Sequence, residues 1–154
     1  MAANAAGGGP KSPVAAAHPP ALVLDTNVVL DWLLFADPRA AAVAAAIESG
    51  AVRWLAASRM RDEFERTLHY PALSRWKPES ERLLSIFDRH AVIRPAPPTS
   101  PRLRCSDADD QIFIDLALTT GARWLLTRDR ALLRLRRRAA ESGILVMPPE
   151  RWAL

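Results

Sequence analysis

The sequence predicts a single α/β domain of three layers, in which a mainly parallel, five-stranded sheet lies between two layers of helices. Short apolar runs, typical of buried strands, alternate along the chain with longer segments of helical periodicity. The chain has 154 residues, about the length of one domain, and 49% of them are hydrophobic, which is enough for one buried core. These observations favour a folded protein and exclude a wholly disordered chain.

The first twenty residues differ in composition from the rest. They contain seven alanines, three glycines and four prolines without apolar periodicity, so we expect a flexible leader over 1–20 and a folded domain over 21–154. A start codon assigned too early is the other interpretation. Glycines and prolines interrupt the apolar stretch that a secretory signal needs, and Cys105 is the one cysteine. We therefore expect no membrane segment and a reducing, cytoplasmic location.

The first strand is predicted over 21–24, where the aliphatic run ALVL ends abruptly at polar residues. A short helix over 28–35 follows. Pro38 suits the first position of the next, alanine-rich helix, because the N–H that proline lacks has no partner there, and Gly50 is the expected stop.

The middle of the chain predicts two more strands and two more helices. The strands are expected over 52–56 and 91–93. The first of these helices runs from Ser58, as its N-cap, to about His69, and the second is expected over 78–89.

The final third begins with residues 94–104, which contain too much proline for a helix or a strand and predict a surface loop. The clearest helix follows over 109–120, where apolar residues recur at helical spacing before Gly121. The last three elements are a strand, a basic helix and a strand, over 124–127, 131–140 and 144–147.

Two aspartates directly follow apolar strands. Asp25 comes after the strand over 21–24, and Asp129 comes after the strand over 124–127. Ligands of open α/β sheets gather at the carboxyl ends of the strands, so we expect both carboxylates at that edge. Each aspartate could equally cap the helix that follows it.

Two further acids are expected at the same edge. Asp110 opens the helix over 109–120 on its inward side, and Glu63 lies beside the apolar side of its own helix. Acids at these positions also have ordinary structural roles that need no shared site. Acids near a helix N-terminus, such as Asp107 and Asp109, stabilise the helix dipole, and Glu63 could be the exposed partner of a nearby arginine.

Four converging carboxylates would repel one another, which raises their pKa values and destabilises the empty site. A divalent cation relieves this repulsion, and oxygen ligands without histidine or thiolate favour Mg²⁺ or Mn²⁺ over zinc. A bound cation makes water a better nucleophile and offsets charge that develops on a phosphoryl group. The acids therefore predict metal-assisted hydrolysis of a phosphodiester.

Four segments carry these acids and their neighbours. They read LVLDTNVVLDWLL, SRMRDEFERTL, DADDQIFIDLA and ARWLLTRD. In that order and at those separations they resemble the PIN-domain nucleases, and most of all the bacterial branch of toxin components in toxin–antitoxin pairs, related to VapC. The resemblance extends over about residues 21–148. It implies a parallel sheet of strand order 3-2-1-4-5 and an endoribonuclease that uses Mg²⁺ or Mn²⁺.

The resemblance also assigns roles to individual residues. One residue departs from the family pattern, because Arg128 stands where glycine often precedes the last aspartate, and we expect it to alter the turn or to contact a substrate phosphate. By resemblance, the catalytic and metal-binding acids are Asp25, Glu63, Asp110 and Asp129. The residues that support this site are Thr26, Asn27 and Thr127, together with Asp107, an additional acid of this branch.

Positive charge is concentrated after the last predicted acid. The chain has a formal net charge of +4, and six arginines with one aspartate lie between residues 128 and 138. Such a stripe attracts nucleic-acid phosphate without reading sequence, although a solvated helix face is the alternative. RNA is preferred to DNA by resemblance alone. The expected RNA-binding residues are Arg128, Arg130, Arg134, Arg136, Arg137 and Arg138.

Partner binding follows mainly from the resemblance, because similar family members form homodimers that a small antitoxin inhibits. Residues 40–46 are alanine-rich, which allows close approach of a second helix, either from a partner or from the same chain. The five tryptophans could stack on unpaired bases, but most lie among aliphatic residues and we expect them in the core.

Other functions fit the sequence less well. A phosphatase with an aspartyl nucleophile usually needs a second acid two residues later, where this chain has Asn27. No glycine-rich phosphate loop with a following lysine is present, which excludes a nucleotide hydrolase of that class. The remaining alternative is a catalytically inactive module of the same fold that binds RNA or protein.

Overall fold

The structure is a computed structural model and describes residues 18–154. The leader predicted over 1–20 therefore lies mostly outside the described residues. The carbonyl groups of Pro19 and Pro20 accept hydrogen bonds from Arg53 at 3.0 and 2.9 Å, so contacts with the domain begin before its predicted boundary.

Five parallel strands form one sheet with the order β3-β2-β1-β4-β5. This result confirms the predicted α/β class and the strand order that the family resemblance implies. The strands are β1 (Ala21–Leu24), β2 (Arg53–Ala57), β3 (Ala91–Arg94), β4 (Trp124–Leu126) and β5 (Leu145–Met147).

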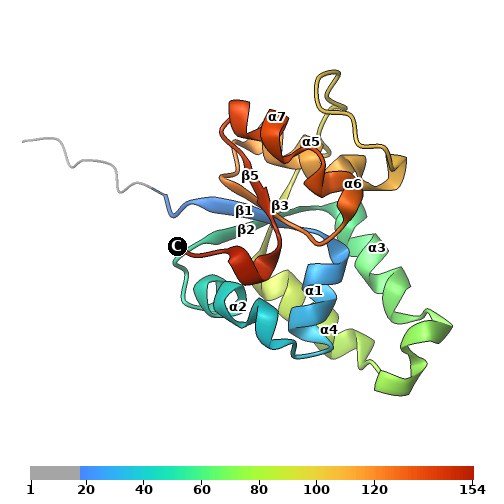
Figure 1. Cartoon of the computed structure of the whole chain (residues 1–154). Helices are drawn as coiled ribbons and strands as arrows, with labels where there is room; N and C mark the ends of the chain where they lie inside the picture. The colour runs from blue at the N-terminus through green and yellow to red at the C-terminus, as the bar shows by residue number, and fades with distance from the viewer. Residues whose placement is uncertain (1–17) are drawn as a thin grey trace, which may run out of the picture.

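Helices cover both faces of the sheet, which makes three layers (Figure 1). One side carries α1 (Thr26–Leu33), α2 (Ala41–Glu48), α3 (Ser58–Leu68) and α4 (Ser80–His90). The other carries α5 (Gln111–Thr120), α6 (Arg130–Leu133) and α7 (Arg136–Glu141). Short 3₁₀ helices are η1 (Pro38–Ala40), η2 (Pro71–Trp76), η3 (Ala108–Asp110) and η4 (Pro149–Arg151). None of the helices within residues 18–154 has both the length and the apolar character to cross a bilayer.

The basic segment predicted as one helix over 131–140 is instead two helices, α6 and α7. The N–H of Leu135 donates to the carbonyl of Leu132, only three residues back, at 3.0 Å. This tighter turn interrupts the α-helix while both leucines stay in the core. The arginines after the break therefore belong to a separate helix.

The start of α3 also differs from the prediction. Ser58 is the first residue of the helix and not its N-cap, because β2 continues as far as Ala57, which takes the cap position. At the other end of the chain the expected stop of α5 is confirmed, since Gly121 adopts the left-handed region with φ of 65°.

The core forms where β1 is packed from both faces. Leu22 and Val23 are fully buried, and Phe113 of α5 and Phe64 of α3 are at most 2% exposed. The expectation that most tryptophans belong to the core is confirmed, because three of the five are buried. These are Trp54, Trp124 and Trp152.

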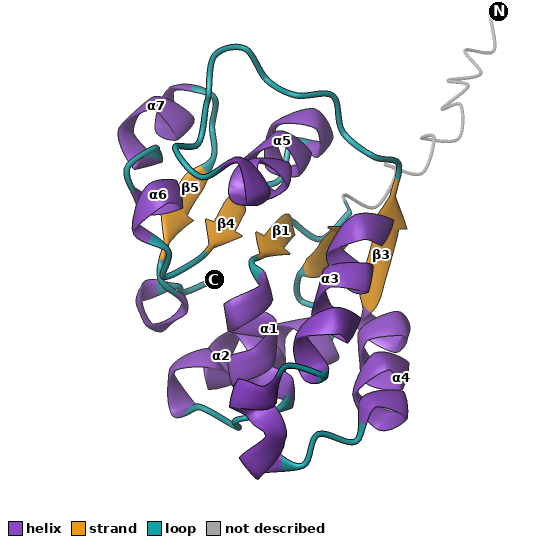
Figure 2. Ribbon diagram, turned by 90° about the vertical axis from the view of Figure 1, so that its right-hand side faces the viewer, coloured by secondary structure: helices purple, strands orange, loops and turns teal. Residues whose placement is uncertain are grey.

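The position of β1 explains where a site can form. The chain places β2 and β3 on one side of β1 and then crosses to place β4 and β5 on the other (Figure 2). Sheets of this kind bind ligands at the point where the strand order reverses, outside the carboxyl ends of the strands. The N–H of Asp25 donates to the carbonyl of Leu126 at 3.1 Å, so the ends of β1 and β4 meet there.

Candidate active site

The four predicted acids line one hollow at the carboxyl edge of β1 and β4. The hollow has a volume of about 330 Å³, and we call it the acidic hollow. Two of the predicted supporting residues, Thr26 and Asn27, also line it. The acids come from four segments that are far apart in the sequence, and they are Asp25, Glu63, Asp110 and Asp129.

Asp25 is both a helix cap and a member of the acidic hollow. One carboxylate oxygen, Oδ1, accepts from the N–H of Val28 at 2.9 Å and so caps α1, while Oδ2 accepts from the hydroxyl of Thr127. Asp25 is 4% exposed. Burial raises its pKa to about 6, although the hydrogen bonds from Thr127 and Val28 oppose this rise.

Thr127 connects two of the acids. Its fully buried hydroxyl donates to Asp25 and accepts from the backbone N–H of Asp129 at 2.9 Å. The Oδ1 atom of Asp129 accepts from the N–H of Ala131 at 2.7 Å and caps α6. The capping alternatives are therefore correct for both aspartates. They do not compete with a place in the hollow, because capping uses only one oxygen of each carboxylate.

The pKa of Asp110 is raised further than that of Asp25. Asp110 ends η3 and is half-buried, and burial raises its pKa to about 7. The nearby charge of Asp129, and a hydrogen bond between the two carboxyls, raise this pKa further. Asp107 and Asp25 add to the effect through their charges. Asp107 itself is exposed and caps η3, where it accepts from the N–H of Asp109 at 3.0 Å.

Glu63 projects from α3 toward the start of α1. Its Oε2 atom accepts from the hydroxyl of Thr26 at 3.3 Å. The alternative of an ion pair with an arginine is not realised anywhere in residues 18–154. The paired arginine of α3 is Arg61, whose Nε lies 2.6 Å from an oxygen of Asp88.

Arg128, the departure from the family pattern, forms an ion pair with Asp31 of α1. The Asp31 side chain is only 6% exposed; burial raises its pKa, and the charge of Arg128 opposes that rise. Sequence analysis misses Asp31, although an acid within the apolar run VVLDWLL is a signal that a partner is needed. Asp31 and Arg128 line a second hollow, of about 540 Å³, together with Asp129 and Arg130.

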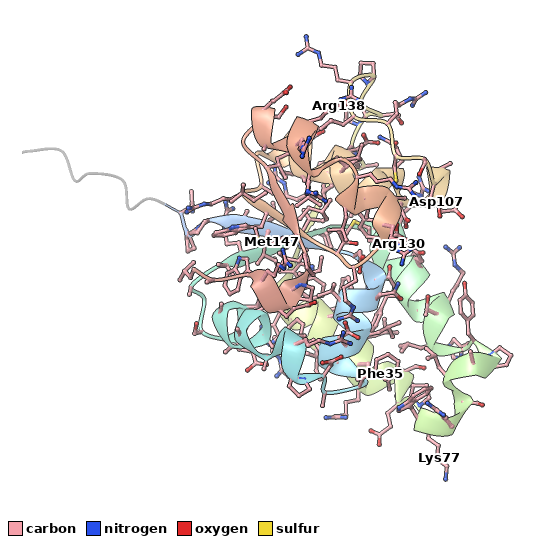
Figure 3. All side chains as sticks on the ribbon, in the orientation of Figure 1. Phe35, Lys77, Asp107, Arg130, Arg138 and Met147 are labelled. Carbon is pink, nitrogen blue, oxygen red and sulfur yellow. The ribbon has the colours of Figure 1, made fainter. Side chains whose placement is uncertain are left out.

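Two of the six arginines of the predicted stripe line a hollow at the site. Arg128 and Arg130 line the hollow beside Asp129. In Figure 3, Arg130 lies on the side of α6, whereas Arg138 lies at the top of the view, where it donates to the carbonyl of Arg102. The other members are exposed on or next to α6 and α7, and they are Arg134, Arg136 and Arg137.

One face of α3 carries residues that sequence analysis misses. Arg59 precedes Glu63 by one turn of α3, Arg66 follows it by three residues and Tyr70 lies two residues beyond the end of the helix; all four line a hollow of about 220 Å³ that also includes Asp109 and Ile112. We call it the bridging hollow. The spacing of Arg59, Glu63, Arg66 and Tyr70 is the signal in the sequence that could have identified this face.

The chemistry of the acidic hollow suits a hydrated, hard cation. Its acids offer only oxygen ligands, and burial, together with repulsion from Asp129, raises the pKa values of Asp25 and Asp110. In residues 18–154, however, no three acidic, histidine or cysteine side chains are gathered closely enough to hold a metal ion between them. The fit to a hard ion rests on the oxygen donors alone, since Mg²⁺ takes one or two carboxylates directly and keeps several waters.

Comparison with known proteins agrees with this geometry. A family model described as PIN domain matches residues 21–131. Among solved structures, VapBC2 from Rickettsia felis bound to a DNA fragment from its promoter matches with a TM-score of 0.55. The match covers 82% of this chain and 96% of the other, at 11% sequence identity, so it shows a shared fold. No curated protein matches the sequence.

Proposed function

Because the chain belongs to the PIN domain family, whose members are in general nucleases, we propose that it is a ribonuclease that hydrolyses RNA with the help of Mg²⁺ or Mn²⁺. One observation supports this most strongly. Four acids from separate segments line a single hollow at the point where the strand order reverses. The raised pKa values of two of them point to a missing positive charge.

The cation would be held by Asp25, Glu63, Asp110 and Asp129, directly or through water, since all four line the same hollow. When bound, a divalent cation makes water a stronger nucleophile and offsets the charge that develops on the phosphoryl group. The donor set favours Mg²⁺ or Mn²⁺, because all of its ligands are hard oxygens.

The other residues of the site position these acids. Thr127 holds Asp25 through its hydroxyl and holds the backbone of Asp129 through the same oxygen, so it sets the spacing of the two. Thr26 donates to Glu63 and orients its carboxylate. Oriented partners of this kind typically change metal affinity or activity by about 10- to 100-fold when they are removed.

The RNA strand would be attracted by arginines that flank the acids. Arg128 and Arg130 line the hollow beside Asp129, where phosphates adjacent to the scissile bond would pass. The remaining members of the stripe would add weaker, more distant attraction from α6 and α7. They are Arg134, Arg136, Arg137 and Arg138.

We also propose that the chain is the toxin component of a toxin–antitoxin pair. The support is the motif resemblance, together with the fold that the chain shares with a structure of VapBC2. A homodimer in the cytoplasm, inhibited by a small antitoxin, is the corresponding assembly. Ala41, Ala42 and Ala45 are exposed on α2 and offer a face of small residues that a partner helix could approach.

Cleavage of a defined RNA tests the nuclease proposal. The full chain is incubated with an end-labelled single-stranded RNA and Mg²⁺, beside a DNA of the same sequence, a sample with EDTA, and the Asp25→Asn variant. We expect cleavage of RNA that EDTA and the variant both abolish. Cleavage that persists in the variant would indicate a contaminant. RNA binding without cleavage under any divalent cation would instead support the inactive binding module.

A further inference from the structure

A further pocket, separate from the three hollows described above, lies between α3, α5 and the loop that leads to η3. Its volume is about 430 Å³, within the range typical of small-molecule sites. We call it the loop pocket. Its main polar and reactive lining residues are Arg59, Thr99, Arg104, Cys105, Gln111 and Asp115.

The loop pocket and the acidic hollow each share lining residues with the bridging hollow. The bridging hollow shares Arg59 and Ile112 with the loop pocket, and it shares Glu63 and Tyr70 with the acidic hollow. Electrostatics agree with this proximity. Burial raises the pKa of the Cys105 thiol, and the charges of three acids at or beside the acidic hollow raise it further. They are Asp110, Asp129 and Asp107.

Side chains of α5 hold the wall of the loop pocket in place. The side-chain oxygen of Gln111 accepts from the N–H of Cys105 at 2.7 Å, and its nitrogen donates to the carbonyl of Leu103 at 2.8 Å. The same nitrogen donates to Oδ1 of Asp115 at 2.9 Å, and the N–H of Ser100 donates to that oxygen at 2.8 Å. The segment predicted as a surface loop is thus anchored to α5 at several points.

Asp115 leaves one carboxylate oxygen open to the pocket. The residue is 3% exposed, yet it lines the pocket, and both of its hydrogen bonds go to Oδ1. Within residues 18–154 no side chain or backbone group donates to Oδ2. Oδ2 of Asp115 is not one of the fully buried side-chain atoms left without a partner, so it is accessible and can accept a hydrogen bond from a ligand in the pocket that presents an N–H group.

The positive charge of two arginines limits the kinds of N–H donor that can bind in the pocket. Arg59 and Arg104 line the pocket, are exposed, and have no acidic partner at ion-pair distance within the described part of the chain. They would repel a lysine or arginine side chain and attract phosphate. A nucleotide within the proposed RNA substrate combines such an N–H donor with flanking phosphates.

We infer that the loop pocket binds a nucleobase of the RNA substrate. The exocyclic amino group of the base would donate a hydrogen bond to Asp115, and Arg59 and Arg104 would bind the neighbouring phosphates. The inference rests on the proposed ribonuclease function and deepens it, because it assigns a base preference. Cytosine, adenine and guanine carry an exocyclic amino group, and for cytosine and adenine there is a matched base without it. Uracil and hypoxanthine carry a carbonyl oxygen in its place, which would face the Asp115 oxygen as a second acceptor.

The test measures binding without cleavage. Fluorescence anisotropy of short labelled RNA homopolymers is measured in EDTA, comparing cytidine with uridine and adenosine with inosine. We expect the wild-type chain to bind the amino-bearing member of at least one pair about tenfold more tightly, from one charge-assisted hydrogen bond. Asp115→Asn should remove that preference, because an amide can also donate to a carbonyl.

Charge variants separate the phosphate contacts from base recognition. Arg59→Gln with Arg104→Gln should weaken binding of both members of a pair equally and lower the slope of log affinity against log salt by about 1.4. The matched control is Arg82→Gln with Arg89→Gln, two exposed arginines of α4 that line none of the four hollows described above. It should leave the affinity within twofold of wild type. Because the arginine variants alter only exposed side chains, they remain informative if Asp115→Asn fails to fold.

Each contrary result overturns a distinct claim. Equal binding of both members in both pairs by the wild-type chain would overturn the base pocket while leaving RNA cleavage untouched. A salt slope unchanged by the Arg59 and Arg104 variants would overturn the phosphate contacts. Failure to bind any RNA would overturn the ribonuclease proposal as well. Binding of an oligoarginine peptide that is lost in Asp115→Asn would show that the pocket takes a protein side chain instead.

Discussion

Arg128 and Asp31 form an ion pair that ties the turn carrying Asp129 to the helix that begins directly after Asp25. Asp25 and Asp129 are therefore linked twice, once through this pair and once through the hydroxyl of Thr127. A glycine in place of Arg128 could make no such link. In this chain the departure from the family pattern serves to hold the site together.

Breaking that ion pair should destabilise the fold. Arg128→Gly leaves Asp31 as a buried charge without its partner, so we expect the free energy of unfolding to fall by about 2 to 4 kcal/mol in urea titrations. Asp31→Leu combined with Arg128→Leu should recover most of this loss. The control is Arg39→Ala, which breaks the exposed Asp37–Arg39 pair and should change stability little. A loss no larger than that of the control would contradict the role given to Arg128.

Stability in EDTA should depend on pH in the direction set by Asp25 and Asp110. Their folded-state pKa values, about 6 and about 7, exceed the ordinary value of 3.8. At pH values between 3.8 and about 7 the folded state binds more protons than the unfolded state. The two aspartates therefore make the protein less stable as the pH rises through this range. Asp110→Asn removes one of these charges. Its advantage over the wild type in thermal unfolding should grow from pH 4 to pH 7 and then level off; an advantage that is constant with pH would be inconsistent with the raised pKa.

Divalent cations should stabilise the folded chain. Mg²⁺ or Mn²⁺ at a hundred times its Kd should add about 2.7 kcal/mol to the stability, which differential scanning calorimetry detects as a rise in Tm. At one fixed concentration of the ion, the effect should be larger at pH 7.5 than at pH 5.5, because the carboxylates must lose their protons to bind the ion and the Kd is therefore lower at the higher pH. Asp110→Asn should reduce the shift, whereas Asp62→Asn, at an exposed position of α3 outside the acidic hollow, should not. Equal shifts in both variants would place the ion elsewhere.

Thr127 should matter through its hydroxyl alone. Thr127→Val keeps the shape of the side chain but removes the donor to Asp25 and the acceptor for the N–H of Asp129. We expect cleavage of RNA to fall about 10- to 100-fold. Thr127→Ser keeps the hydroxyl and should retain most of the activity. If the serine and valine variants lose activity to the same extent, packing rather than hydrogen bonding explains the role of this residue.

The arginines of the basic stripe should not be equivalent. Arg130 lines a hollow with Asp129, whereas Arg136 and Arg137 are exposed on α7 and line none of the hollows described above. Arg130→Gln should therefore weaken binding of single-stranded RNA more than Arg136→Gln or Arg137→Gln does, as measured by anisotropy in EDTA at low salt. The reverse order would show that the strand crosses α7.

Much of the fold could be predicted from the sequence because each element has a strong local signal. The strand over 21–24 is an uninterrupted aliphatic run, and Gly121 ends α5 because it adopts a left-handed conformation at little cost. The boundaries that depend on several segments at once were wrong. Ser58 is not the N-cap, because β2 continues to Ala57. Residues 131–140 do not form one helix, because a tight turn at Leu135 divides them into two.

The acids could be predicted as a group because a parallel sheet brings the ends of its strands to one edge, and apolar strands that end in aspartate show this in the sequence. Their individual environments could not be predicted in this way. Thr127, two residues before Asp129, donates its hydroxyl to Asp25, which is 102 positions away in the sequence. Arg128 forms its ion pair with Asp31 across a similar separation.

The sequence by itself determined the order of the elements, the family and the set of acids, because these follow from local periodicity, from residues that end strands and from motif spacing. Only the tertiary structure decided which charges are paired, which are left exposed and which side chains share a hollow. Burial and distance control those outcomes, and both are properties of segments that meet only after the chain has folded.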